Sequence, residues 1–316
     1  PKVVWVEELE RYVMALYLAG DRYRLLTSGD LLNWESLQEL SLPGDNECPD
    51  IYPLTLDGKR HWVLSGARDI YLVGRFEADG FHVESGPRRL CHSEVSYAAQ
   101  SFSGLPDGRI VRIAWNRLHI PSPRFSQQMG FPVEMRLERQ DGEYLLAAQP
   151  IREIETLWEG CESLSQISLS QPLSLNTGLQ ALDLSLKMPV RPGARLTLRL
   201  FGCELKLNPE QNELTCGTVR MPLQLRPEAQ QIGQSGQPQL KQAQNEVELR
   251  ILVDCATVEL FADGGKLCAT VSALWDPNLP RVELIPQGEP YIESLSCRIL
   301  RDTLPPVPTP SAGELR

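Results

Sequence analysis

The stretch His61-Trp62-Val63-Leu64-Ser65-Gly66-Ala67-Arg68-Asp69-Ile70-Tyr71-Leu72-Val73-Gly74 contains two mainly apolar runs of five residues with a short break between them. Runs of this length fit strands, whereas buried helices usually need ten or more residues. Asp57-Gly58 precedes the two runs and Asp79-Gly80 follows them, and Asp-Gly is typical of tight turns. We therefore predict consecutive short strands joined by hairpin turns.

The same pattern continues in both directions along the chain. Several further runs alternate apolar and polar residues, which is typical of strands with one face in water. We expect these strands at residues 3–6, 12–17, 110–115, 196–200, 247–251 and 257–261. Helical periodicity is nearly absent, and its best candidate is residues 151–158, directly after Pro150. The sequence thus predicts an all-β protein.

The spacing of strands and turns divides the chain into two main parts. Residues 1–150 fit the four-stranded sheets of a β-propeller, and residues 160–302 fit a β-sandwich. We expect a linker at residues 151–159. Residues 226–246, rich in Gln, Gly and Pro, are predicted to be a loop between sandwich strands, and the proline-rich residues 303–316 a disordered tail.

Charge and hydropathy exclude several classes of partner. The 316 residues carry a formal net charge of −10, which argues against nucleic acid and anionic membranes, because both attract basic surfaces. No apolar run approaches the roughly 20 residues that span a bilayer. No signal peptide is expected, since the chain begins at Pro1-Lys2-Val3 inside a predicted strand.

The cysteines are scattered along the chain and form no Cys-x-x-Cys pair. A zinc site is therefore not expected, and no cofactor is implied. Most of them stand in apolar contexts, so we predict reduced, buried thiols and a cytoplasmic protein, while pairing among the sandwich cysteines stays open. The eight residues are Cys48, Cys91, Cys161, Cys203, Cys216, Cys255, Cys268 and Cys297.

The tetrapeptide Glu47-Cys48-Pro49-Asp50 is a candidate for catalysis. Proline fixes its own φ and restricts the residue before it, so we expect Glu47 on an extended, rigid segment. A rigid, partly buried glutamate suits a general acid, because burial raises its pKa towards neutral pH. The alternative is an ordinary surface turn, because short motifs rarely carry chemistry by themselves.

Several segments together resemble one family, the glycoside hydrolases of family 32, which include invertases, levanases, inulinases and fructan exohydrolases. Glu47-Cys48-Pro49-Asp50 resembles the acid motif of this family, and Tyr97-Ala98-Ala99-Gln100-Ser101-Phe102 resembles its Tyr-Ala-Ala-Gln-Thr-Phe strand. The other matching segments are Ile113-Ala114-Trp115-Asn116, Phe125-Ser126-Gln127-Gln128-Met129, Phe131-Pro132-Val133-Glu134, Val253-Asp254 and Val258-Glu259-Leu260-Phe261 with Gly264. The resemblance implies a partial five-bladed β-propeller followed by a C-terminal β-sandwich.

Two family motifs are not found in the sequence. The first is Asn-Asp-Pro-Asn-Gly, which holds the nucleophilic aspartate, and the second is Arg-Asp-Pro, whose aspartate stabilises the transition state. Pro1-Lys2-Val3-Val4-Trp5 is similar to the continuation of Arg-Asp-Pro, so we expect the chain to begin within that motif. Arg68-Asp69-Ile70 echoes it but follows the acid motif and lacks the proline, so we interpret it as the start of a strand.

The resemblance implies roles for five residues. Glu47 would be the acid/base, and the others would bind substrate. Cys48 would tune the acid or touch the sugar, or else be a buried structural thiol, and Asp50 would orient the acid or cap the turn. Trp115 would line the sugar pocket or lie in the core between blades, and Tyr97 carries the same alternatives. Glu94 is a further candidate for a substrate contact.

We therefore expect a truncated family 32 enzyme. The whole enzyme would hydrolyse terminal β-fructosyl bonds of sucrose or fructans with retention, and this chain alone would be nearly inactive, because losing one member of a catalytic set removes most of the rate. Two alternatives are a non-catalytic fructan-binding remnant and an oligomeric scaffold. Unpaired sheet edges favour a homo-oligomer, or a missing N-terminal half as partner.

Overall fold

The computed structural model of the protein describes residues 1–93, 95–120, 126–175, 177, 181–191, 193–208, 211–223, 246–254, 256–273 and 282–303. Most of the loop predicted at 226–246 and of the tail predicted at 303–316 lies outside these residues, as do Glu94 and Cys255. Almost all regular structure in the described residues is β-strand, which confirms the predicted all-β class. Among them, no helix has both the length and the apolar character required to cross a bilayer.

The first two sheets are four-stranded antiparallel meanders in sequence order, the pattern of propeller blades. The first sheet consists of β1 (Lys2–Val6), β2 (Arg11–Ala19), β3 (Arg22–Ser28) and β4 (Glu35–Ser41), with the short 3-10 helix η1 (Glu7–Leu9) after β1. The second sheet consists of β5 (Asp50–Leu56), β6 (Lys59–Ser65), β7 (Ile70–Glu77) and β8 (Gly80–Arg89). Asp57 and Gly58 both have positive φ, as the predicted two-residue hairpin turn requires.

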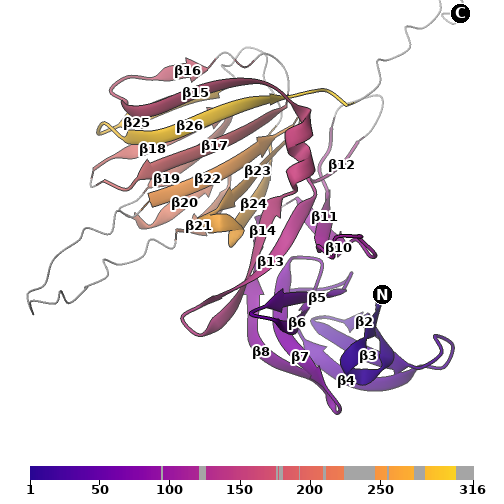
Figure 1. Cartoon of the computed structure of the whole chain (residues 1–316). Helices are drawn as coiled ribbons and strands as arrows, with labels where there is room; N and C mark the ends of the chain where they lie inside the picture. Colours follow the sequence, from indigo (N-terminus) through magenta and orange to yellow (C-terminus); the bar gives the residue numbers. More distant parts are fainter. Residues whose placement is uncertain are drawn as a thin grey trace, which may run out of the picture.

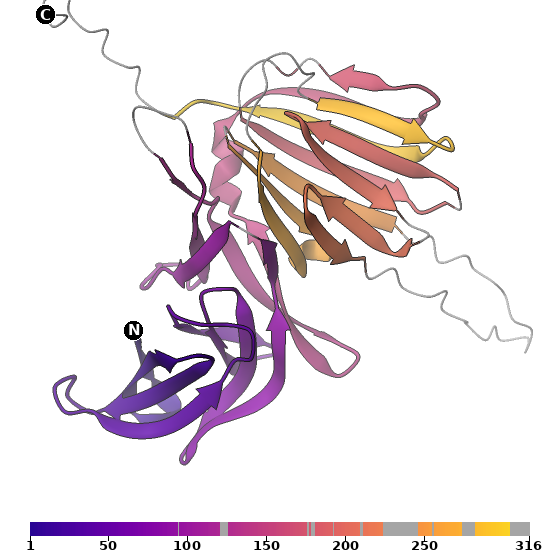
Figure 2. The ribbon, with the colours of Figure 1, turned by 180° about the vertical axis from the view of Figure 1, so that it is seen from behind.

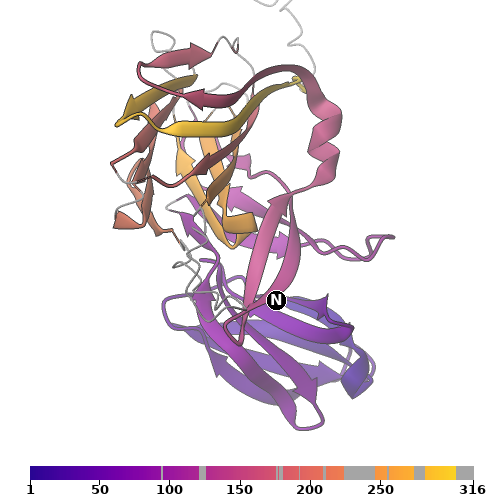
Figure 3. The ribbon, with the colours of Figure 1, turned by 60° about the vertical axis from the view of Figure 1, so that its left-hand side comes forward.

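The third sheet lies between the first two sheets and the rest of the molecule (Figures 1 and 3). It consists of β10 (Ser96–Ser101), β11 (Val111–Asn116), β13 (Val133–Gln140) and β14 (Glu143–Pro150), with β12 (Gln128–Met129) paired to β11. The 3-10 helix η2 (Arg152–Leu157) follows, with Ile154 buried, at the position of the predicted linker. This sheet therefore has neighbours on both sides.

Two further sheets face each other and form a β-sandwich (Figures 1 and 2). One contains β15 (Trp158–Ser168), β26 (Tyr291–Leu300), β17 (Leu182–Pro189), β22 (Glu246–Val253), β23 (Thr257–Ala262), β24 (Leu267–Ser272) and β9 (Cys91–Ser93) in that order, with η4 (Asp263–Gly265) after β23. The other contains β16 (Leu173–Leu175), β25 (Val282–Gln287), β18 (Arg195–Leu200), β19 (Cys203–Asn208), β20 (Glu213–Cys216) and β21 (Val219–Pro222).

A strand from the first part of the chain joins the sandwich. β9 pairs in parallel with β24, and Cys91 lies opposite Cys268. Ser93 Oγ donates to the carbonyl of Thr270 at 2.7 Å and accepts the backbone N–H of Ser96 at 2.7 Å. The start of β10 is thereby hydrogen-bonded, through Ser93, to the edge of the sandwich.

Apolar packing and one buried carboxylate complete this junction. Met135 of the third sheet, Val63 of the second and Phe261 of the sandwich belong to one buried cluster. Glu259 Oε1 accepts the backbone N–H of Phe131 at 3.1 Å and the side-chain amide of Asn116 at 3.3 Å. Glu259 is only 5 % exposed, and burial raises its pKa to about 7. The junction is therefore a packed interface that contains an ionisable group.

Candidate active site

Glu47 lies in the loop between β4 and β5, and its backbone differs from the prediction. Glu47 has φ of 53° and Cys48 has φ of 35°, so both are left-handed, and the expected extended segment is wrong. The residue that Pro49 restricts is Cys48, where proline favours extended backbone, so the positive φ of Cys48 departs from that preference. Such backbone is unfavourable for residues with a Cβ, so the surroundings must hold it.

Asp45 holds the loop in this conformation. Its carboxylate accepts the backbone N–H groups of Asn46 at 2.7 Å, Arg68 at 2.7 Å and Ile70 at 2.8 Å. Burial raises the pKa of Asp45, against the effect of these three bonds. A Cβ on Gly66 would lie 2.5 Å from Asp45 Cγ, so the approach of the two segments requires glycine there.

Two tyrosines fix Glu47 itself. Tyr23 Oη donates to the Glu47 carbonyl at 3.2 Å, and Tyr97 Oη donates to Glu47 Oε2 at 2.6 Å. Burial and the bond to Glu47 raise the pKa of Tyr97 to about 12, so it remains a donor at neutral pH. The Glu47 side chain is exposed, not partly buried as predicted. Tyr97 engages Oε2, and within the described part of the chain no hydrogen bond reaches Oε1.

Trp115 stands beside Tyr97. The two residues are register partners on β11 and β10, and their ring centroids lie 6.4 Å apart. Trp115 is 38 % exposed, and its indole N–H donates to Gln127 Oε1 at 2.6 Å. This exposure is inconsistent with the alternative of a core tryptophan between blades. The structure therefore brings Glu47, Tyr97 and Trp115 together, with Tyr97 buried and in contact with both exposed residues.

Arginines gather on the other side of Tyr97. The guanidinium of Arg117 lies 3.7 Å from the centroid of the Tyr97 ring. Among the residues that the structure describes, Arg68, Arg89 and Arg117 have no carboxylate within ion-pair distance. The pocket they border has a volume of about 320 Å³ and is lined by Arg68, Asp69, Arg89, Cys91, Ser93, Ser96, Tyr97 and Arg117. It therefore carries a local positive charge.

Asp50 is buried beneath the acid loop and is not exposed on its surface. Its side chain is fully buried, and its two oxygens accept the backbone N–H of Ser101 at 2.7 Å and its hydroxyl at 2.9 Å. Lys2 and Arg112 each approach within 3.6 Å. Asp50 thus connects β5 to β10 by hydrogen bonds. It lies beneath the surface of the loop that carries Glu47.

Cys48 is exposed, so the alternative of a buried structural thiol is wrong. Its carbonyl accepts from the Gln100 side chain at 3.3 Å, which connects the acid loop to β10. Asp69 precedes β7, as predicted, and its carboxylate binds the guanidinium of Arg112 at 2.6 Å. That pairing leaves Asp69 engaged within the protein.

Sequence reasoning missed three residues that support this site: the buried Asp45 and Tyr23, and Arg117 beside Tyr97. Their partners are distant in sequence, and no local pattern signals them. Among the described residues, one group could in principle ligate a metal, namely Glu77, Asp79 and His82 in the β7–β8 hairpin. All three are exposed, and His82 is already hydrogen-bonded to Asp79 at 2.6 Å, which raises the pKa of the imidazole.

Comparison with known proteins identifies the family. The family model for the N-terminal domain of glycosyl hydrolases family 32 matches residues 1–150, and the model for the C-terminal domain of that family matches residues 205–283. The chain belongs to glycoside hydrolase family 32. This confirms the resemblance on which Glu47 was selected.

Individual family 32 relatives agree with this. A levanase of Bacillus subtilis is 28 % identical over 346 residues, covering 95 % of this chain and 50 % of the levanase. A sucrose-6-phosphate hydrolase of Zymomonas mobilis is 26 % identical over 185 residues, covering 56 % of this chain and 35 % of the relative. This chain therefore spans about half the length of the levanase.

A solved structure supports the fold. The exo-inulinase of Aspergillus awamori superimposes with a TM-score of 0.78 at 17 % identity, covering 96 % of this chain and 67 % of the inulinase. The shared architecture confirms the predicted combination of propeller sheets and a sandwich.

Proposed function

We propose that this chain carries the acid/base side of a site that hydrolyses terminal β-fructosyl bonds of sucrose or fructans with retention. The observation that carries the proposal is the Glu47 carboxyl, presented on an exposed loop with one oxygen fixed by Tyr97 at 2.6 Å. Glu47 would protonate the leaving oxygen and later deprotonate the attacking water, as the acid/base of a retaining glycosidase does.

The substrate class follows from the neighbours of Glu47. Trp115 exposes part of its ring beside Tyr97, and a flat apolar face suits the carbon face of a furanose ring. The levanase relative makes a fructan a reasonable substrate. Retaining enzymes place the nucleophile about 5–5.5 Å from the acid. We propose that this nucleophile comes from residues outside the 316 of this chain, which lack both aspartate motifs.

The first test is hydrolysis. The chain alone is incubated with sucrose, inulin and levan, and released fructose is measured; we expect no release above the blank, for lack of the nucleophile. The same assay is run with Glu47→Gln and with Glu10→Gln, which changes an exposed glutamate outside the site. The comparison separates an effect of Glu47 itself from a general effect of removing a surface carboxylate. Robust release by the chain that disappears in Glu47→Gln would contradict the proposed inactivity and demand a nucleophile within these residues.

A non-catalytic function is the main alternative, and the exposed Trp115 favours it. A fructan-binding remnant would bind levan or inulin and release no fructose. Isothermal titration with levan oligosaccharides measures this, and Trp115→Ala should weaken binding at least tenfold if the ring is a stacking platform. Equal affinity of Trp115→Ala and the unmodified chain would exclude Trp115 from the binding surface.

A second candidate substrate is a phosphorylated fructoside. Arg68, Arg89 and Arg117 border the pocket beside Tyr97 without carboxylate partners among the described residues, and guanidinium groups suit phosphate. The sucrose-6-phosphate hydrolase relative makes this class plausible. Binding of sucrose 6-phosphate is compared with that of sucrose; a preference that Arg68→Ser with Arg89→Ser removes would favour it, and equal binding would exclude it.

Self-association is proposed through the first sheet. β1 is an edge strand, and Val3 and Trp5 on it are 39 % and 46 % exposed. Unpaired edges with apolar side chains promote pairing with another chain. Light scattering at micromolar concentration should show an oligomer that Trp5→Lys dissociates. A monomer under these conditions would exclude the scaffold alternative.

A further inference from the structure

Two cysteines of the sandwich lie in contact. Cys203 begins β19 and Cys216 ends β20, and their sulfur atoms are 3.8 Å apart. β19 and β20 are neighbours in the six-stranded sheet, and the backbone N–H of Gly217 donates to the carbonyl of Glu204 at 3.2 Å. The two thiols therefore stand on strands that hydrogen bonds already hold side by side. A disulfide bond is about 2.05 Å long, so the side chains must move closer from 3.8 Å for the sulfurs to bond.

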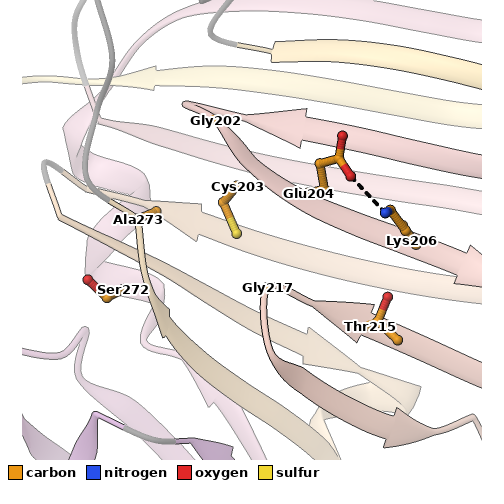
Figure 4. A pocket seen from close by; sticks show the side chains of 8 residues that line it. All are labelled: Gly202, Cys203, Glu204, Lys206, Thr215, Gly217, Ser272 and Ala273. Carbon is orange, nitrogen blue, oxygen red and sulfur yellow. Dashed lines mark ion pairs between the residues drawn. The ribbon is translucent and has the colours of Figure 1, made fainter.

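A pocket opens next to Cys203. Its volume is about 450 Å³, which is in the range of small-molecule sites. Figure 4 shows the Cys203 side chain directed towards Gly217, with Ser272 and Ala273 across the pocket. Glu204 and Lys206 form an ion pair at 2.8 Å along its side, so their charges largely offset each other. The pocket thus gives a small reagent access to Cys203.

The two sulfurs differ in access and in acidity. Cys203 is half-buried, whereas Cys216 has no exposed surface. The hydrogen bond between the thiols lowers the pKa of Cys203 and, together with burial, raises that of Cys216. Because the thiolate is the nucleophile in thiol–disulfide exchange, Cys203 is the first to react. Cys216 is placed to attack second.

We propose that Cys203 and Cys216 form a modification site, which a low-molecular-weight disulfide entering the adjacent pocket converts to an intramolecular disulfide. In the first step the Cys203 thiolate attacks one sulfur of the reagent, the reagent S–S bond breaks, and one thiolate leaves. In the second step Cys216 attacks Cys203 Sγ, the S–S bond between Cys203 and the reagent breaks, and the departing thiolate takes up the Cys216 proton. Two protein thiols are oxidised and one reagent disulfide is reduced to two thiols.

The new bond would close a short loop from β19 to β20. Such a cross-link stabilises a protein mainly by restricting its unfolded chain. We therefore expect oxidation to raise the melting temperature of the sandwich by roughly 5 °C. The effect should concern the sandwich, because both cysteines belong to its core cluster or pack against it.

Peptide mapping tests the proposal directly. The full chain is incubated with oxidised glutathione, remaining thiols are alkylated, and the protein is digested with trypsin without reduction. Cleavage after Arg199, Lys206 and Arg220 separates the two cysteines onto peptides 200–206 and 207–220. We expect these peptides to be recovered linked, and the buried Cys297 to be alkylated only after unfolding. Recovery of both peptides unlinked, while the exposed Cys48 carries glutathione, would overturn the proposal.

Single variants test the order of attack. Cys216→Ser should stop at a mixed disulfide on Cys203, because the second thiol is missing. Cys203→Ser should leave Cys216 unmodified in the folded chain, and Cys48→Ser should leave the cross-link unchanged. Reaction of Cys216 in Cys203→Ser at the rate of an exposed thiol would overturn the assigned order. The cross-link in the unmodified chain remains decisive if either variant fails to fold.

Discussion

Glu47 and Glu259 lie in two different family motifs and have opposite environments. Glu47 is exposed on a left-handed loop, and one of its oxygens is fixed by a tyrosine hydroxyl. Glu259 is buried at the junction, where it accepts from the backbone of Phe131 and the side chain of Asn116. Only the first is exposed to solvent. A glutamate in a family motif can thus lie exposed on a loop or buried in a packed interface. Its exposed fraction and its hydrogen-bond partners distinguish the two cases.

The largest effect on stability should come from the support beneath the acid loop. Asp50→Ala leaves the backbone N–H and hydroxyl of Ser101 without an acceptor and removes a carboxylate from beside Arg112. We expect the free energy of unfolding to fall by about 4 kcal/mol, measured by urea denaturation. Asp50→Asn retains an acceptor oxygen and should lose less. Equal stability of Asp50→Ala and the unmodified chain would show that this network is dispensable.

The junction carboxylate should rank next. Glu259→Ala deprives the Phe131 N–H and the Asn116 amide of their acceptor and leaves a cavity, so the free energy of unfolding should fall by about 3 kcal/mol. Glu259→Gln keeps an acceptor in the same place and should cost less than about 1 kcal/mol. If Gln and Ala are equally destabilising, the hydrogen bonds are not the reason for the effect.

The same residue predicts a pH dependence. Burial raises the pKa of Glu259 to about 7 from its ordinary value of 4.5. Below the lower value both states are protonated; between the two values the unfolded chain loses the proton and the folded chain keeps it, so stability falls as pH rises. The decrease should reach about 2–3 kcal/mol between pH 4.5 and 7. Urea denaturation of Glu259→Gln across this range should lack that component, and an unchanged slope would contradict the assignment.

The smallest effect should be that of Glu47. The side chain is exposed, and Glu47→Gln still offers Tyr97 an oxygen, so the free energy of unfolding should change by less than about 1 kcal/mol. Thermal denaturation of the two chains in parallel measures this. A loss of unfolding free energy comparable to that of Glu259→Ala would mean that Glu47 stabilises the loop. The two carboxylates would then have the same structural role.

The strands were predictable because the residues that determine them are close together in the sequence. Residues 61–65 and 70–74 lie within β6 and β7, and 257–261 lie within β23, because short apolar runs bounded by turns have few other ways to bury themselves. Asp57-Gly58 forms its turn for the same local reason. The fold class follows from the repetition of such segments.

The site was predictable only in part. The acid motif identified Glu47, and two further family segments identified Tyr97 and Trp115, which the structure places together. The buried role of Asp50 depends on Ser101 and Arg112, which are more than fifty residues away in sequence. Likewise, the left-handed backbone at Glu47 depends on the anchor of Asp45 to a separate loop. Long-range contacts of this kind leave no local pattern.

β9 has a consequence for how such proteins can be recombined. The three residues of β9 follow β8, the last strand of the second propeller sheet, and they pair with β24. The chain then enters β10, which contains Tyr97. A chimera cut at η2, the obvious joint, would separate β24 from its partner and loosen the start of the strand that carries the donor to Glu47. The sandwich and β9 are therefore a single module for exchange, although Cys91 and its register partner Cys268 lie 177 residues apart in sequence.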